Sequence, residues 1–95
     1  MTTADPDRGD ENEREARKER EARELDRKLG KAVKVRRAMR EWSQEDLAAA
    51  TGIGKRTLVR LEAGNTMQIT QVDRIAQAFG MDLVGFLTFA QSLED

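Results

Sequence analysis

Two neighbouring basic residues, Lys55 and Arg56, have the chemistry and the setting to bind a nucleic acid. Arg60 follows about one helical turn later. The guanidinium fork of Arg56 matches guanine O6 and N7, whereas lysine serves guanine or phosphate. A helix that begins near Lys55 would present these donors to base edges in the major groove, with Thr57 directed at a thymine methyl or a phosphate and Arg60 at phosphate. Arg56 therefore predicts at least one G·C pair in the site.

The residues around this basic group have the spacing of two short helices packed across a tight turn. Residues 43–64 read SQEDLAAATGIGKRTLVRLEAG. The small Ala48 allows the second helix to cross closely, and Gly52 can adopt the positive φ that reverses the chain. The positions that would clamp the helices together are all apolar: Leu47, Ile53, Leu58 and Leu61. The pattern predicts that the two helices pack rigidly against each other and that the helix beginning near Lys55 exposes its basic side chains.

Start signals for helices precede and follow this pair. Ser43 can cap the helix after it, with Asp46 at the reciprocal position of a capping box and Trp42 packing onto Leu47. Stacking of Trp42 on a base is the alternative to this structural role. Further along, we expect three signals: Thr70 with Asp73 starts a fourth helix, Gly80 stops it, and Asp82 caps the last helix.

The first 28 residues differ from the rest and form a charged N-terminal extension, residues 1–28, before a domain of residues 29–95. Residues 1–9 are expected to be disordered, because they are polar and contain Pro6 and Gly9. A helix then begins near Asp10 or Glu13 and becomes amphipathic at about Ala22. Acid-before-base pairs favour it: Glu13 with Arg17, Glu19 with Arg23 and Glu24 with Lys28. Two alternatives are a frayed charged tail and an arm that touches DNA or a partner protein.

Composition excludes several classes of function. The 95 residues contain no cysteine and no histidine, so disulfides, thiolate metal sites and the commonest general base are absent. No nucleophile–base set or phosphate-binding glycine loop is present, and we expect a protein that is not an enzyme and has no cofactor. The longest apolar-rich stretch, Met81 to Leu93, is too short to span a bilayer, and Met1 to Gly9 lacks the features of a signal peptide. A soluble, cytoplasmic protein is expected.

A net charge of −1 conceals an uneven distribution. Residues 1–28 contain ten acidic and eight basic side chains, whereas residues 29–95 contain eight acidic and nine basic ones. Eight of those nine basic residues lie between Lys31 and Arg60. This clustering predicts a local positive field of the kind that a phosphate backbone attracts.

Residues 43–64 resemble the helix-turn-helix of the XRE family, the lambdoid-repressor and Cro group, and the resemblance extends from about Leu29 to Leu87. The family's first helix resembles LGKAVKVRRAMREW, the end of its recognition helix LVRLEAG, and its fourth and fifth helices ITQVDRIAQAFGMDLVGFL. The resemblance implies an all-α, five-helix lambda-repressor-like domain. Two residues depart from the pattern. Thr51 replaces an apolar residue, which predicts a weaker contact beneath the turn, and Arg36 replaces a frequent leucine.

The resemblance also assigns roles to individual residues. Ser43 and Gln44 at the start of the second helix, and Asn65 and Thr66 after the recognition helix, match positions that hold the DNA backbone. Arg37 matches an arginine that forms a partly buried ion pair with a glutamate, here Glu62; direct contact of Arg37 with phosphate is compatible with that pair.

The last helix is predicted to carry an apolar stripe wider than one contact face needs. Its members recur at helical spacing: Leu83, Phe86, Leu87, Ala90 and Leu93. One interpretation is that the stripe closes the core. The other, suggested by the family's fifth helix, is a two-fold interface that makes a homodimer and places two recognition helices one turn of DNA apart. A monomer on an asymmetric site is the third possibility.

These patterns favour a sequence-specific, double-stranded-DNA-binding transcriptional regulator that acts as a repressor. Two other classes compete with it. The run LGKAVKVRRAMREWSQ also resembles the start of HipB-type antitoxins, in which the extension or last helix would bind a toxin. A protein-binding transcriptional adaptor is the other, and the exposed basic pair at Lys55 and Arg56 argues against it.

Overall fold

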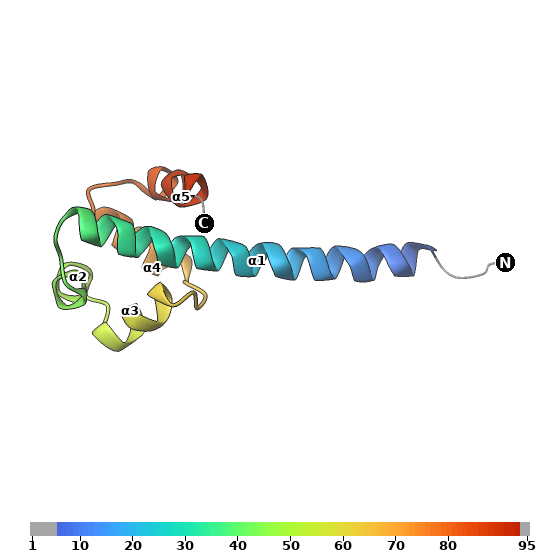
Figure 1. The fold of residues 1–95 in the computed structure, drawn as a ribbon, viewed down its shortest axis with the longest axis horizontal. Coiled ribbons are helices and arrows are strands. Elements are labelled where there is room, and N and C mark those ends of the chain that lie inside the picture. The colour runs from blue at the N-terminus through green and yellow to red at the C-terminus, as the bar shows by residue number, and fades with distance from the viewer. Residues whose placement is uncertain (1–5, 94–95) are drawn as a thin grey trace.

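Five helices make up the part of the chain that the computed structural model describes, residues 6–93. They are α1 (Pro6–Met39), α2 (Gln44–Thr51), α3 (Lys55–Glu62), α4 (Ile69–Ala78) and α5 (Leu83–Ser92). Figure 1 shows α2 and α3 on one side of α1 and α5 on the other. The predicted all-α, five-helix fold is confirmed.

The extension and the first helix of the domain are one continuous helix of 34 residues. It begins at Pro6, before the expected start near Asp10 or Glu13, so the predicted disorder is wrong for residues 6–9; residues 1–5 lie outside the described part of the chain. Proline has no N–H to leave unpaired in a first helical turn, which suits it to the start of a helix. The N-terminal half of α1 projects away from the other helices (Figure 1), and the side chains of residues 11–25 in it are exposed. We name residues 11–25 the arm.

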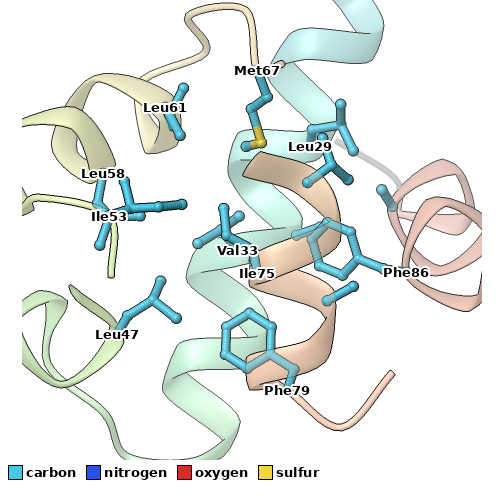
Figure 2. Packing of buried hydrophobic residues seen from close by; sticks show 14 residues of the cluster. Leu29, Val33, Leu47, Ile53, Leu58, Leu61, Met67, Ile75, Phe79 and Phe86 are labelled. Carbon is cyan, nitrogen blue, oxygen red and sulfur yellow. The ribbon is translucent and has the colours of Figure 1, made fainter. Parts of the chain in front are cut away.

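The core begins at Leu29, shortly after the arm. Fourteen buried apolar residues from all five helices and their loops converge between α1 and the other helices (Figure 2). An aromatic stack runs through the core, with ring centroids 5.8 Å apart for Trp42 and Phe79 and 6.3 Å apart for Phe79 and Phe86. The half-buried Trp42 ring therefore has a structural role in this stack.

The apolar stripe of α5 divides between the core and the surface. Phe86 and Ala90 are completely buried within the single chain. Their prediction as interface residues is therefore wrong, because α5 uses them to close the core against α1 and α4. Leu83, Leu87 and Leu93 are only half-buried and pack at the edge of the core. Val84 instead is 70% exposed.

The two residues that depart from the family pattern are accommodated in different ways. The Thr51 hydroxyl donates to the carbonyl oxygen of Leu47 at 2.8 Å and accepts from the Ile53 N–H at 3.1 Å, so hydrogen bonds replace an apolar contact beneath the turn. The guanidinium of Arg36 lies over the Phe89 ring at 5.1 Å from its centroid. Arg36 thus joins α1 to α5 through a cation–π contact.

The predicted cap of the fourth helix is wrong, and that of the last helix is right. Gln68 caps α4 and forms a reciprocal pair with Gln71, two residues before the expected Thr70. The Gln71 amide oxygen accepts from the Gln68 N–H at 2.8 Å, so an amide oxygen serves where a carboxylate oxygen is usual. Asp82 caps α5 as predicted, accepting from the Gly85 N–H at 2.6 Å.

Candidate nucleic-acid interface

The turn between α2 and α3 has the geometry that its residues predict. Ser43 Oγ accepts from the Asp46 N–H at 3.0 Å, and the Ser43 N–H donates to the Asp46 carboxylate at 2.8 Å, which completes the capping box. Gly52 ends α2 with a φ of 74°. The Ser43 hydroxyl is used as a cap and fixes the start of α2, where Ser43 and Glu45 are exposed.

The recognition helix, α3, buries one face and presents the other. Leu58 and Leu61 are buried, whereas Lys55, Arg56 and Arg60 are exposed. Thr57 is half-buried beside them. Of the four predicted base-reading residues, the structure therefore places three on the open surface and one at its edge.

The two leading basic residues differ in their surroundings. Lys55 Nζ donates to Glu45 Oε2 on α2 at 3.0 Å. Arg56 has no hydrogen bond or ion pair to any residue in the part of the chain that is described. Of these two residues, Arg56 can therefore reach a base edge without first breaking a contact.

A polar network joins α1, α2 and α3 behind this surface. Arg37 donates two hydrogen bonds to the Glu62 carboxylate, from Nε at 2.9 Å and from Nη2 at 3.0 Å. Arg37 Nη1 donates to the carbonyl oxygen of Trp42 at 3.0 Å. The hydrogen bond to Glu62 raises the pKa of the Arg37 guanidinium. Gln44 Nε2 also donates to Glu62, at 3.1 Å. The predicted Arg37–Glu62 pair is confirmed, and the Gln44 side chain is engaged inside the protein.

The two residues after α3 are tied back to the protein. Asn65 Nδ2 donates to the carbonyl oxygen of Arg60 at 2.8 Å, which caps the end of α3. Thr66 Oγ1 donates to the Asp26 carboxylate on α1 at 2.8 Å. Both residues remain exposed, so the loop holds a fixed shape at the edge of the basic surface.

Comparison with known families agrees with this geometry. A family model described as helix-turn-helix matches residues 33–86, more than half of the chain. The chain belongs to the helix-turn-helix family, of the XRE type. It is a DNA-binding transcriptional regulator in the general sense that the family defines. No curated protein matches the sequence closely enough to add a relative.

This helix-turn-helix domain contains a close approach that the sequence did not reveal. Gly30 is buried in the C-terminal half of α1, and a Cβ there would lie 2.6 Å from the carbonyl oxygen of Leu61 and 2.9 Å from that of Glu62. The recognition helix thus ends directly against the backbone of α1. A glycine inside a long helical pattern was the sequence signal for this close approach.

No helix within residues 6–93 is long and apolar enough to cross a membrane.

Gly30→Ala should destabilise the helix-turn-helix domain. Alanine gains about 0.5 to 1 kcal/mol of helix propensity, but overpacking costs about 1 to 3 kcal/mol, and backbone carbonyls cannot rotate away. We expect a net loss of about 1 kcal/mol or more in the free energy of unfolding, measured in urea. Gly54→Ala is the steric control, because a Cβ there meets nothing within 4 Å and the change should cost only the cap preference of glycine at the start of α3. A higher midpoint for Gly30→Ala than for the unmodified protein would contradict the close approach.

Proposed function

We propose that this regulator reads a specific operator in the major groove with α3 and acts in the cytoplasm as a repressor. The observation that supports this proposal most strongly is the exposure of Arg56, which has no partner among the described residues. The helix that carries it, α3, is fixed to α1 by the ion pair of Arg37 and Glu62. Lys55, Thr57 and Arg60 flank it and complete the reading surface. A small domain that occupies its site excludes other proteins from it, so repression requires no further activity.

Phosphate contacts would come from both edges of this surface. The N-terminus of α2 offers backbone N–H groups and the positive end of a helix dipole, while the Gln44 side chain stays with Glu62. At the other edge, the exposed loop of Asn65 and Thr66 is held in place by its contacts to Arg60 and Asp26. Arg37, which is engaged by Glu62, would support the surface rather than contact phosphate directly.

Arg56→Ala tests the base-reading role. A bidentate contact to guanine is lost, so affinity for a duplex selected by the wild-type protein from a random library should fall by about 1 to 3 kcal/mol. Discrimination should relax at one base pair, and affinity for random DNA should change far less. Fluorescence anisotropy measures both affinities. Arg74→Ala, which removes an exposed charge from α4, is the control; equal losses on selected and random DNA would remove Arg56 from the base readers.

The oligomer that fits this function is a homodimer formed through the exposed side of α5. Val84 is 70% exposed, and the half-buried Leu83 and Leu87 lie next to it. A two-fold axis at this patch would place two copies of α3 on successive half-sites, about one helical turn apart. The proposed interface therefore centres on Val84, Leu83 and Leu87, with Phe86 and Ala90 supporting it from the core.

One feature favours an antitoxin as the second candidate. The arm projects from the domain and forms, with Gln91 of α5, a groove of about 510 Å³. The groove is lined by charges of both signs and by Leu25, which is 36% exposed. A toxin could dock on this surface while α3 reads the operator. Co-purification with the product of an adjacent gene, abolished by deletion of residues 1–21, would support this candidate.

A further inference from the structure

An acidic side chain lies within the basic surface at the start of α3. Glu45 on α2 accepts a hydrogen bond from Lys55 Nζ at 3.0 Å, and the side chains are 66% and 52% exposed, respectively. The hydrogen bond from Lys55 lowers the pKa of the Glu45 carboxyl group below its ordinary value, which favours the carboxylate form of Glu45. In the free protein, the Lys55 charge is therefore already neutralised.

Because of this ion pair, a contact between Lys55 and a phosphate adds little to the affinity for DNA. To bind phosphate, Lys55 must exchange one oxyanion for another, and it leaves the Glu45 carboxylate unpaired beside a polyanion. An exposed ion pair is worth only about 0 to 1 kcal/mol, so the pair can open, but the repulsion between Glu45 and the DNA backbone remains. Random-sequence DNA is bound almost wholly through phosphate contacts. The repulsion from Glu45 therefore lowers the affinity for random-sequence DNA in full.

The same pair is complementary to one base-pair edge. In the major groove, guanine presents acceptors that lysine can serve, and its partner cytosine presents the N4 amino donor that a glutamate accepts. Lys55 and Glu45, which come from adjacent helix N-termini, can meet both groups of a G·C pair as one unit. At such a site both charges keep hydrogen-bond partners, and no exchange with phosphate is required.

We propose that Glu45 is a specificity-determining residue: through its pair with Lys55 it weakens binding to random DNA and favours a G·C pair opposite the two side chains. This inference depends on the proposed reading of DNA by α3. It assigns to an acidic residue a share of sequence discrimination, in addition to the part proposed for Arg56.

Glu45→Gln tests the inference on a random-sequence 30-base-pair duplex titrated with potassium chloride. Lys55 should become free to bind one phosphate, so affinity should rise several-fold, and the slope of log K against log salt should steepen by about 0.9. Glu21→Gln changes the net charge equally but lies on the arm, away from α3, and should leave the slope unchanged. In a Lys55→Met background, Glu45→Gln should no longer steepen the slope, because no lysine is freed to bind a phosphate.

A second measurement uses duplexes that the wild-type protein selects from a random library. Glu45→Gln should gain less on these duplexes than on random DNA, so the specificity ratio should fall. Equal slopes for Glu45→Gln and Glu21→Gln, or an unchanged ratio, would overturn the inference even though the wild-type protein binds and selects DNA. A wild-type protein that selects no sequence would instead overturn the proposed function itself.

Discussion

Arg37→Met should lower the free energy of unfolding by about 3 kcal/mol. The substitution leaves the Glu62 carboxylate, whose side chain is only 3% exposed, without its cationic partner. Breaking a buried ion pair from one side costs about 3 to 5 kcal/mol, and the lower end applies because the Arg37 side chain is 21% exposed. Gln44 remains as a neutral donor to Glu62 and cannot replace the charge. Thermal and urea unfolding measure the loss.

The double variant Arg37→Met with Glu62→Leu distinguishes a lost net attraction from a stranded charge. Replacing both members of a buried pair by apolar residues is often close to neutral, so most of the stability should return. The recovered protein should still bind DNA less well than the wild type, because Glu62 no longer anchors Gln44 at the start of α2. If Arg37→Met unfolds at the same urea concentration as the wild type, the pair does not carry the contact between α1 and α3.

Most features of the fold that were predicted correctly are encoded by residues close together in the chain, whereas the pair of Arg37 and Glu62, 25 residues apart, was expected from the family resemblance. The capping box of Ser43 with Asp46 spans three residues, and the turn at Gly52 needs one glycine with positive φ. The burial of Leu58 and Leu61 follows from helical spacing. Local patterns of this kind leave few alternatives, and the structure agrees with them.

Contacts made across long distances in the chain could not be predicted in the same way. Thr66 meets Asp26 from 40 residues away, and Gln44 meets Glu62 from 18 residues away. Either side chain is equally suited by type to a phosphate or to a protein partner. Only the arrangement of α1 against α3 decides between them, and that arrangement depends on the close approach at Gly30.

The orientation of α5 shows a different limit of periodicity. Spacing groups Phe86 and Ala90 with Leu83 and Leu87, but so many positions are apolar that the pattern does not say which side faces inward. The packing of Phe86 on Phe79 determines it. Val84 then points outward, although by type it is as apolar as the residues that are buried.

Val84→Glu should convert the proposed dimer to a monomer without unfolding it. A substitution at a side chain that is 70% exposed should change the free energy of unfolding by about 0.5 kcal/mol or less. Near a two-fold axis, however, each new carboxylate meets its own copy and must be desolvated without a partner. Sedimentation velocity should therefore show a monomer. Ala22→Glu, which adds the same charge on the exposed arm, should leave the dimer intact.

Loss of the dimer should weaken binding to a full operator about 100-fold or more and leave half-site binding unchanged. Linking two half-site readers makes the second binding event intramolecular, and such coupling raises affinity by about 100- to 10,000-fold without any new contact. Each α3 surface stays intact in Val84→Glu, so only this gain is lost. A mixture of Val84→Glu and Val84→Arg provides the decisive test. Opposite charges can pair across the two-fold axis, so the mixture should restore both the dimer and the affinity for a full operator. If the mixture binds no better than either variant, or if the wild type is monomeric both free and on its operator, α5 is not the interface, and the asymmetric monomer becomes the better account of DNA reading.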